Sequence, residues 1–425
     1  MKSFFLNSKN IDHDSVIWNM LGSMLMAFQS VIFLIILTRV VGLEISGVFT
    51  IAYANANLFL NIGKYGMRNY QVSDVKNQFS FNEYLCSRWI TSAIMIVVSL
   101  VYVCIAAGVN GYSPEKSQII IWMCLFKVPD AMEDIYYGQY QKKGRLDVAS
   151  KIMTVRMGIT ILLFGIVIFV SKNLLITLIT ATGITTLLTV VFINWTSPHF
   201  CGRESCKIRN IGGLLWNCFP AFAGLFLSFY IGNASKYAID AQLSDEIQAC
   251  YGFIAMPVFV IGVLNGFILN PLLYKMSCLW SDKNIKEFTK KILFLSLTVS
   301  LITIVCVIGA YILGIPVLSL LYNTDLSLYK AELLILLLGG GFLGLSGVFN
   351  AAIIIIRCQR ELLYGYAIVA VLAFVMSKRV VGDYGITGAS VLYSLLMAVL
   401  CVFFIGIFVA GILGKGRKQD TVDGK

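Results

Sequence analysis

The sequence predicts an all-α polytopic membrane protein, and three observations point to this fold class. Apolar residues make up 58% of the 425 residues and charged residues 13%, which is about half the charged share of a soluble domain. Twelve largely apolar stretches of about 20 residues fill the chain, and a helix needs this length to cross a bilayer. Lys and Arg are concentrated in every second gap between the stretches.

Each stretch is expected to form one membrane-spanning helix, because a helix satisfies its backbone hydrogen bonds within its own segment. The strands of a membrane barrel would instead alternate over about ten residues. In chain order, the expected helices cover residues 16–38, 47–66, 89–109, 118–138, 152–170, 174–195, 212–232, 248–271, 291–313, 331–356, 362–379 and 388–412. The loop at 196–211 separates six helices from six, which predicts an N-terminal six-helix bundle, residues 1–200, and a C-terminal one, residues 201–425, with a cytoplasmic tail.

The distribution of positive charge predicts the orientation. Of the 33 Lys and Arg, 23 lie at the termini and in the gaps on the same side as the N-terminus, and 7 lie in the opposite gaps; Arg88 and Lys151 are counted among the 23. Because cytoplasmic loops are enriched in Lys and Arg, we expect both termini in the cytoplasm and the protein in the inner (cytoplasmic) membrane. Basic loops facing anionic lipid explain the net charge of +11 without a nucleic-acid partner.

Motifs of soluble enzymes are missing from the sequence. There is no Walker loop, no Gly-x-Ser-x-Gly elbow and no His-Glu-x-x-His motif, and the largest inner gaps of about 20 residues are too short for a separate catalytic domain. His199, Cys201 and Cys206 share one loop but lack a fourth ligand for zinc. We therefore expect a protein that is not an enzyme and needs neither a metal nor another cofactor.

The second span carries a polar stripe with two cations. Tyr53, Asn57, Asn61, Lys64 and Arg68 lie on or near one face of a helix with 100° per residue. A charged side chain costs at least about 2.5 kcal/mol at the centre of a membrane helix, so it usually faces a watery cavity or a partner. The stripe therefore predicts the wall of a cavity. The alternative is snorkelling of the cations to the inner headgroups, which is favoured for Arg68 and stays open for the deeper Lys64.

The fourth span combines a lysine with acids. Lys127, Asp130 and Asp134 lie at i, i+3 and i+7 and stack along one side of the helix, with Glu133 on its flank. Pro129 frees a backbone carbonyl near Lys127 and predicts a bend there. Two interpretations stay open: the group faces a ligand, or Lys127 and its acidic neighbours neutralise one another without one.

Polar residues in the other spans are weaker indications of a site. Arg156 lies one turn into the fifth span, where snorkelling to the interface is favoured. In the eighth span, Pro257, Asn265 and the pair Asn270–Pro271 predict a bent and partly unwound helix. For uncharged polar positions of this kind, packing contacts between membrane helices are the favoured interpretation.

Three segments resemble a known family. Residues 37–53, LTRVVGLEISGVFTIAY, are similar to the run after the first span of polysaccharide-type exporters in the multidrug/oligosaccharidyl-lipid/polysaccharide (MOP) superfamily. Residues 137–151, YGQYQKKGRLDVASK, resemble the end of their fourth span, and residues 383–395, DYGITGASVLYSL, resemble the entry to their last pair of helices.

The resemblance implies a flippase of the Wzx type, which moves undecaprenyl-diphosphate-linked oligosaccharide from the inner to the outer leaflet. It further implies two six-helix bundles in a V shape around a central cationic cavity, alternating access, and polysaccharide polymerase machinery as a partner. The chain departs from this pattern in the acids beside Lys127, and it lacks the additional spans of the peptidoglycan-precursor flippases.

A lipid-linked sugar requires cations for its phosphates and hydrogen-bonding groups for its glycan. Lys64, Arg68, Lys127 and Arg156 are the candidates for the phosphates. Tyr53, Asn57, Asn61 and Gln141 are the candidates for the sugar.

Two other classes of function are weighed against this one. In a MATE-like multidrug or cation antiporter, Asp130 and Asp134 would exchange H⁺ or Na⁺ for an organic cation. A membrane-embedded glycosyltransferase or polymerase would need larger outer loops than the longest one here, of about 17 residues.

Overall fold

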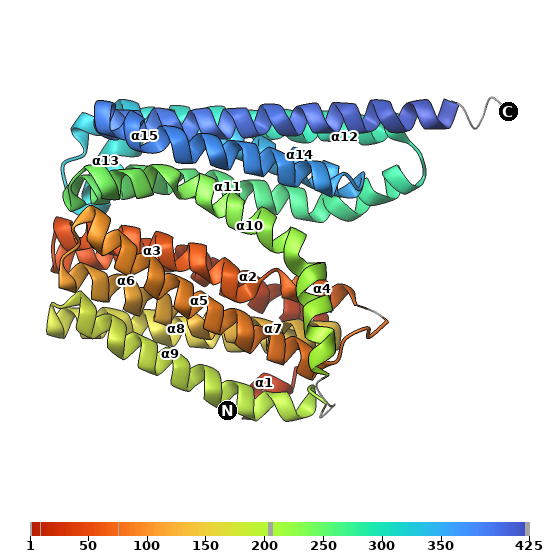
Figure 1. The fold of residues 1–425 in the computed structure, drawn as a ribbon, viewed down its shortest axis with the longest axis horizontal. Coiled ribbons are helices and arrows are strands. Elements are labelled where there is room, and N and C mark those ends of the chain that lie inside the picture. Colours follow the sequence, from red (N-terminus) through yellow and green to blue (C-terminus); the bar gives the residue numbers. More distant parts are fainter. Residues whose placement is uncertain (1, 9, 75, 203–206, 421–425) are drawn as a thin grey trace. The chain divides into compact units, whose positions relative to one another are not determined.

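The computed structural model describes residues 1–425 except residues 1, 9, 75, 203–206 and 421–425, and the described residues form helices and no strand (Figure 1). The end of the predicted cytoplasmic tail, 421–425, and Cys206 therefore lie outside the described residues. The main helices are α1 Lys2–Leu6, α2 Ile11–Val40, α3 Leu43–Lys64, α4 Met67–Ser73, α5 Phe81–Asn110, α6 Pro114–Phe126, α7 Val128–Lys142, α8 Leu146–Ser171, α9 Leu174–Thr196, α10 Ile208–Gln242, α11 Asp245–Ser281, α12 Ile285–Gly309, α13 Ile315–Tyr322, α14 Lys330–Ile355 and α15 Gln359–Asp420. Short 3-10 or π turns lie at Ser197–His199, Ala310–Gly314 and Ser327–Tyr329.

These helices confirm the predicted fold class. Ten helical stretches of the described chain are long and apolar enough to cross a membrane. The stretch that contains α15 holds two of the predicted spans. Between them the backbone leaves the helical conformation at Gly385, with φ 59° and ψ −138°. Another predicted span is formed by α6 and α7 together. Each of the twelve predicted spans therefore lies on a helix, a helix pair or one part of α15, and the chain is a multi-pass membrane protein.

The chain divides into two compact units, unit 1 Met1–Phe226 and unit 2 Leu227–Lys425, and the boundary between them falls within α10. Unit 1 contains α1 to α9 and the first part of α10, and unit 2 contains the remainder. The division into bundles of residues 1–200 and 201–425 stays a prediction.

Two helices of unit 1 are interrupted next to a lysine. The fourth span breaks between α6 and α7 at Lys127, whose N–H bonds to the Cys124 carbonyl at 3.1 Å. Pro129, at the start of α7, has no N–H to continue the helical ladder, so the predicted bend is confirmed. The second span breaks after Lys64, where Tyr65 and Gly66 both adopt left-handed backbone with φ 49° and 64°. Left-handed residues end a helix.

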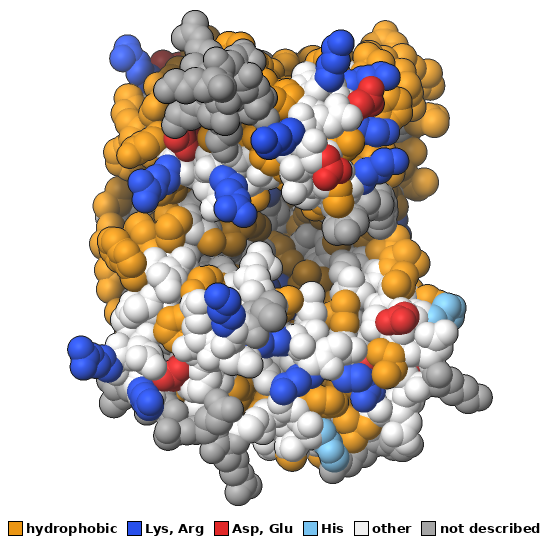
Figure 2. Space-filling view, turned by 90° about the vertical axis from the view of Figure 1, so that its right-hand side faces the viewer, with side chains coloured by type: hydrophobic (Ala, Val, Ile, Leu, Met, Phe, Trp, Pro, Cys, Tyr) orange, Lys and Arg blue, Asp and Glu red, His pale blue; other side chains and the backbone are white. Residues whose placement is uncertain are grey.

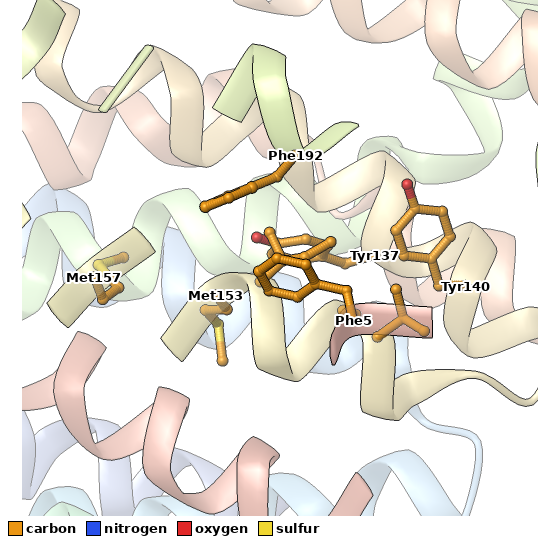
Figure 3. Packing of buried hydrophobic residues seen from close by; sticks show 9 residues of the cluster. Phe5, Tyr137, Tyr140, Met153, Met157 and Phe192 are labelled. Atoms are coloured by element: carbon orange, nitrogen blue, oxygen red, sulfur yellow. The ribbon is translucent and has the colours of Figure 1, made fainter. Parts of the chain in front are cut away.

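A hydrophobic cluster joins the N-terminus to the helices of unit 1. Phe5 of α1 packs with Tyr137 and Tyr140 of α7, Met153 of α8 and Phe192 of α9 (Figure 3). The N-terminal segment is therefore held against α7, α8 and α9.

Polar contacts hold the same segment. Ser8 donates to the Asp147 carboxylate at 2.5 Å, and the Arg145 guanidinium donates to the Leu6 carbonyl at 2.6 Å. Lys151 was expected in an inner loop, but it is buried in α8, where its ammonium pairs with Asp14 at 3.0 Å. The loop assignment failed because α8 begins six residues before the predicted span.

In unit 2, three consecutive glycines bring other helices against α14. A Cβ on Gly339 would lie 2.6 Å from the Ser394 hydroxyl of α15, one on Gly340 2.9 Å from Val258 of α11, and one on Gly341 2.5 Å from Thr303 of α12. Small residues permit such close packing between membrane helices.

The predicted unwinding of the eighth span is wrong. α11 is one continuous helix from Asp245 to Ser281, through Pro257 and the Asn270–Pro271 pair. The favoured packing role of Asn265 agrees with the structure, because its amide donates to the Gly344 carbonyl of α14 at 2.9 Å. Proline is tolerated in membrane helices when neighbouring groups satisfy the freed carbonyls.

Candidate functional site

The charged residues predicted in the second, fourth and fifth spans gather in one place, together with Arg88, which was predicted in a loop. We call this group the buried charge network: Lys64, Arg68, Arg88, Lys127, Asp130, Glu133, Asp134 and Arg156. They come from α3, α4, α5, α7 and α8, together with the break at Lys127.

Arg156 is the centre of the network. Its guanidinium lies 2.6 Å from a carboxylate oxygen of Asp130 and 2.6 Å from one of Glu133, and it donates to the Thr185 hydroxyl of α9 at 2.6 Å. Glu133 also accepts from the Tyr137 hydroxyl at 2.9 Å. Only 1% of Arg156 is exposed. One guanidinium therefore joins α7, α8 and α9.

Lys127 lies at the break of the fourth span and is 2% exposed. Its ammonium donates to Asp130 at 3.2 Å and to the Gln29 amide oxygen of α2 at 2.9 Å. It also lies 4.8 Å from the centre of the Tyr53 ring, a distance at which the ring face attracts a cation. The structure thus brings together the predicted residues Lys127, Asp130 and Tyr53. The ion pair of Lys127 with Asp130 agrees with the interpretation in which Lys127 and its acidic neighbours neutralise one another.

Asp134 binds two arginines. Arg88 of α5 lies 2.9 Å and Arg68 of α4 3.8 Å from its carboxylate oxygens. Arg88 also donates to the Gly63 carbonyl, as does the Thr91 hydroxyl at 2.8 Å. Arg88 and Thr91 therefore satisfy a carbonyl in the last turn of α3, next to the break at Tyr65. Arg68 lies beyond this break.

Two expectations about these arginines are wrong. Arg156 does not snorkel, because two carboxylates on α7 hold its guanidinium inside unit 1. Arg88 is not a loop residue; it is fully buried in the second turn of α5. A capping box, Ser80 with Glu83, marks the true start of α5. That pattern was visible in the sequence and would have placed Arg88 in a helix.

Arg68 and Lys64 differ in their partners. Arg68 donates to the Gln141 amide oxygen at 3.0 Å and is half-buried. Lys64 is also half-buried, and within the described part of the chain its ammonium has no ion-pair partner. It is near enough to Asp130 to interact electrostatically with that carboxylate.

The two asparagines of the polar stripe bond to their own helix. The Asn57 amide donates to the Tyr53 carbonyl and the Asn61 amide to the Asn57 carbonyl, both at 2.8 Å. The stripe is therefore regular α-helix from Tyr53 to Asn61.

The network carries more positive than negative charge. Five cations face three carboxylates, and each carboxylate is already paired with Arg or Lys. With all groups ionised, two positive charges are left over, and Lys64 is the cation without an ion pair among the described residues. Such an arrangement attracts an anion and resists a cation.

The part of the chain that the structure describes contains no group of three or more His, Cys, Asp or Glu side chains placed to hold a metal. The network is the main concentration of buried charge in unit 1, and its chemistry is that of ion pairing and hydrogen bonding.

Comparisons with known proteins agree with this fold. Residues 13–277 match the model of a family described as polysaccharide biosynthesis protein. A comparison with curated protein sequences found no match.

Several solved structures are similar at low sequence identity. An inward-facing multidrug resistance MATE family transporter of the MOP superfamily has a TM-score of 0.68 at 14% identity, over 93% of this chain and 96% of that one. The lipid II flippase MurJ in an inward closed conformation has a TM-score of 0.70 at 14% identity, over 93% and 91%. A MOP superfamily transporter from Pyrococcus furiosus has a TM-score of 0.57 at 13% identity, over 97% of both chains. The resemblance to MOP exporters is confirmed: the chain belongs to the polysaccharide biosynthesis protein family and has the MOP superfamily fold.

Proposed function

We propose that the protein is a flippase that carries undecaprenyl-diphosphate-linked oligosaccharide across the cytoplasmic membrane for cell-surface polysaccharide synthesis. The family is described as acting in polysaccharide biosynthesis, and one similar structure is a lipid II flippase. Both support a cargo that combines a glycan with a lipid. The observation that carries the proposal is the excess of positive charge in the buried charge network.

A diphosphate diester carries two negative charges, which would balance the two positive charges left over in the network. In this proposal, Lys64 meets the diphosphate first, because its ammonium forms no ion pair with a carboxylate among the described residues. Arg68 adds a guanidinium, whose fork binds two oxygens of one phosphate. It lies 3.8 Å from Asp134 and donates to the Gln141 amide oxygen at 3.0 Å, so its reorientation toward a phosphate breaks one long ion pair and one hydrogen bond.

The remaining predicted residues have supporting roles in the proposal. Lys127 and Arg156 are already paired with acids, so we assign them to holding α7 against α2, α8 and α9. Asn57 and Asn61 use their amide nitrogens within α3, which leaves the amide oxygens to accept from sugar hydroxyls. Transport would then be a rocking motion of two halves without bond chemistry.

Cation antiport is less well supported. Its candidate residues, Asp130 and Asp134, would have to exchange a proton or a sodium ion. Asp130 is paired with Lys127 and Arg156, and Asp134 with Arg88 and Arg68. A cation would have to displace two fixed positive charges at either carboxylate, which Coulomb repulsion disfavours.

The test is reconstitution into liposomes with a fluorescent lipid-linked oligosaccharide and an assay of its accessibility in each leaflet. We expect the wild type to equilibrate the lipid between leaflets and Lys64→Gln with Arg68→Gln to abolish this movement. Lys172→Gln is the control, because this substitution removes a lysine charge at the end of α8, away from the network. Proton-driven uptake of an organic cation without movement of the lipid would overturn the proposal.

A further inference from the structure

Unit 2 contains a cavity with both cationic and apolar lining residues, separate from the buried charge network. It has a volume of about 620 Å³ and is lined by Ser277, Trp280, Ser281, Lys283, Ile285, Ile355 and Arg357. These residues come from the α11–α12 and α14–α15 connections and the adjoining helix ends. The end of the helices seen in Figure 2 carries many Lys and Arg side chains, with hydrophobic side chains along its edges. The cavity lies on the side predicted to be cytoplasmic.

Both cations of the cavity are available to a ligand. Lys283 follows the last turn of α11 and Arg357 the last turn of α14, and neither is in an ion pair with a described residue. Each has left-handed backbone with φ 58°, a conformation that glycine or asparagine adopts at lower cost. The C-terminal ends of helices favour a cation, but a left-handed residue after a helix does not require a long side chain. The two cations come from different helix ends and line the same cavity, so together they offer a site for an anion.

We propose that this cavity binds the phosphate-bearing headgroup of an anionic phospholipid from the inner leaflet. Lys283 and Arg357 would hold the phosphodiester, and the Ser281 hydroxyl would donate to its oxygens. The Ser277 hydroxyl already donates to the Leu273 carbonyl at 2.9 Å, so it would accept a hydrogen bond from a hydroxyl of the headgroup. The volume is that of a small-molecule site.

The lining argues for a lipid over a soluble phosphate. Trp280, Ile285 and Ile355 give the cavity an apolar wall beside its cations. A phospholipid presents a phosphate next to acyl chains, and Trp is a common residue at this depth of a membrane. An inorganic phosphate would use only the cations and the hydroxyls and would leave the apolar wall in contact with water.

Titration of the purified protein in detergent tests the proposal, with bound molecules counted by native mass spectrometry. The probes are phosphatidylglycerol, phosphatidylcholine and inorganic phosphate. We expect phosphatidylglycerol to bind more tightly than phosphatidylcholine, and inorganic phosphate not to displace it. Loss of two charged contacts in Lys283→Gln with Arg357→Gln should raise the Kd for phosphatidylglycerol about tenfold or more. The matched control is Lys286→Gln with Lys290→Gln, which removes the same charge from exposed positions of α12 outside the cavity.

A second variant separates binding from folding. Lys283→Gly with Arg357→Gly relieves the left-handed backbone, so we expect a melting temperature at or above that of the wild type together with the same loss of lipid affinity. Equal loss in the control pair would show only diffuse attraction to surface charge and would overturn the proposal. Displacement of the lipid by inorganic phosphate, or equal affinity for the two lipids, would overturn it as well.

Discussion

Replacement of Arg156 by methionine is the most direct perturbation of the buried charge network. Methionine keeps an unbranched side chain but lacks the guanidinium that binds Asp130, Glu133 and Thr185. Asp130 would keep Lys127 at 3.2 Å, whereas Glu133 would keep only the Tyr137 hydroxyl. Removal of one partner from a buried ion pair costs about 3–5 kcal/mol. Because Lys127 and Tyr137 compensate in part, we expect a loss of about 3 kcal/mol in the free energy of unfolding.

A double variant checks the cause of that loss. In Arg156→Met with Glu133→Gln, the carboxylate that lost its cation is replaced by a neutral amide, which costs less to bury. We therefore expect the double variant to be about 1–2 kcal/mol more stable than Arg156→Met, a coupling of the size found for residues in direct contact.

The assay is unfolding of the purified protein in mixed micelles with increasing denaturing detergent, followed by tryptophan fluorescence. Arg156→Lys is the control that keeps the charge but not the fork, and its stability should lie between those of the wild type and Arg156→Met. A loss below about 1 kcal/mol in Arg156→Met would refute the reasoning. So would a double variant that is no more stable than Arg156→Met.

Two further predictions concern transport and packing. Neutralising Lys64 and Lys127 together, by Gln at both positions, should abolish export of the polymer while the protein still reaches the membrane. The measurements are the amount of polysaccharide at the cell surface and the amount of protein in membranes. Unchanged surface polysaccharide would contradict the role of these cations. Gly341→Ala should destabilise unit 2 by about 1–3 kcal/mol by overpacking, because its Cβ would meet Thr303 at 2.5 Å. Gly262→Ala, with nothing within 4 Å, should leave thermal unfolding unchanged or raise its midpoint, and equal effects of the two alanines would refute the packing argument.

The membrane helices could be predicted because their signal is local. A span of apolar residues is one continuous run in the sequence, and the breaks at Lys127 and Gly385 follow from a nearby proline and a glycine. The ends of helices were harder to place where polar residues continue beyond the apolar run, as at α5 and α8. There polar residues continue the helix beyond its apolar run, so hydropathy no longer marks the end of the helix and only caps do.

The partners of the buried charges could be predicted only where they share a helix turn. Lys127 and Asp130 are three residues apart, and their pairing was one of two interpretations of the sequence. Arg156 meets Asp130 and Glu133 across 26 and 23 residues, and Arg88 meets Asp134 across 46. Such pairs depend on which helix faces join when the bundle packs, and hydropathy carries no information about this. Because burying a lone charge is costly, each such cation must have a partner or contact water. The sequence therefore implied one of these two for Arg156. The packing of the helices determines which, and in the structure the partners are the carboxylates of Asp130 and Glu133.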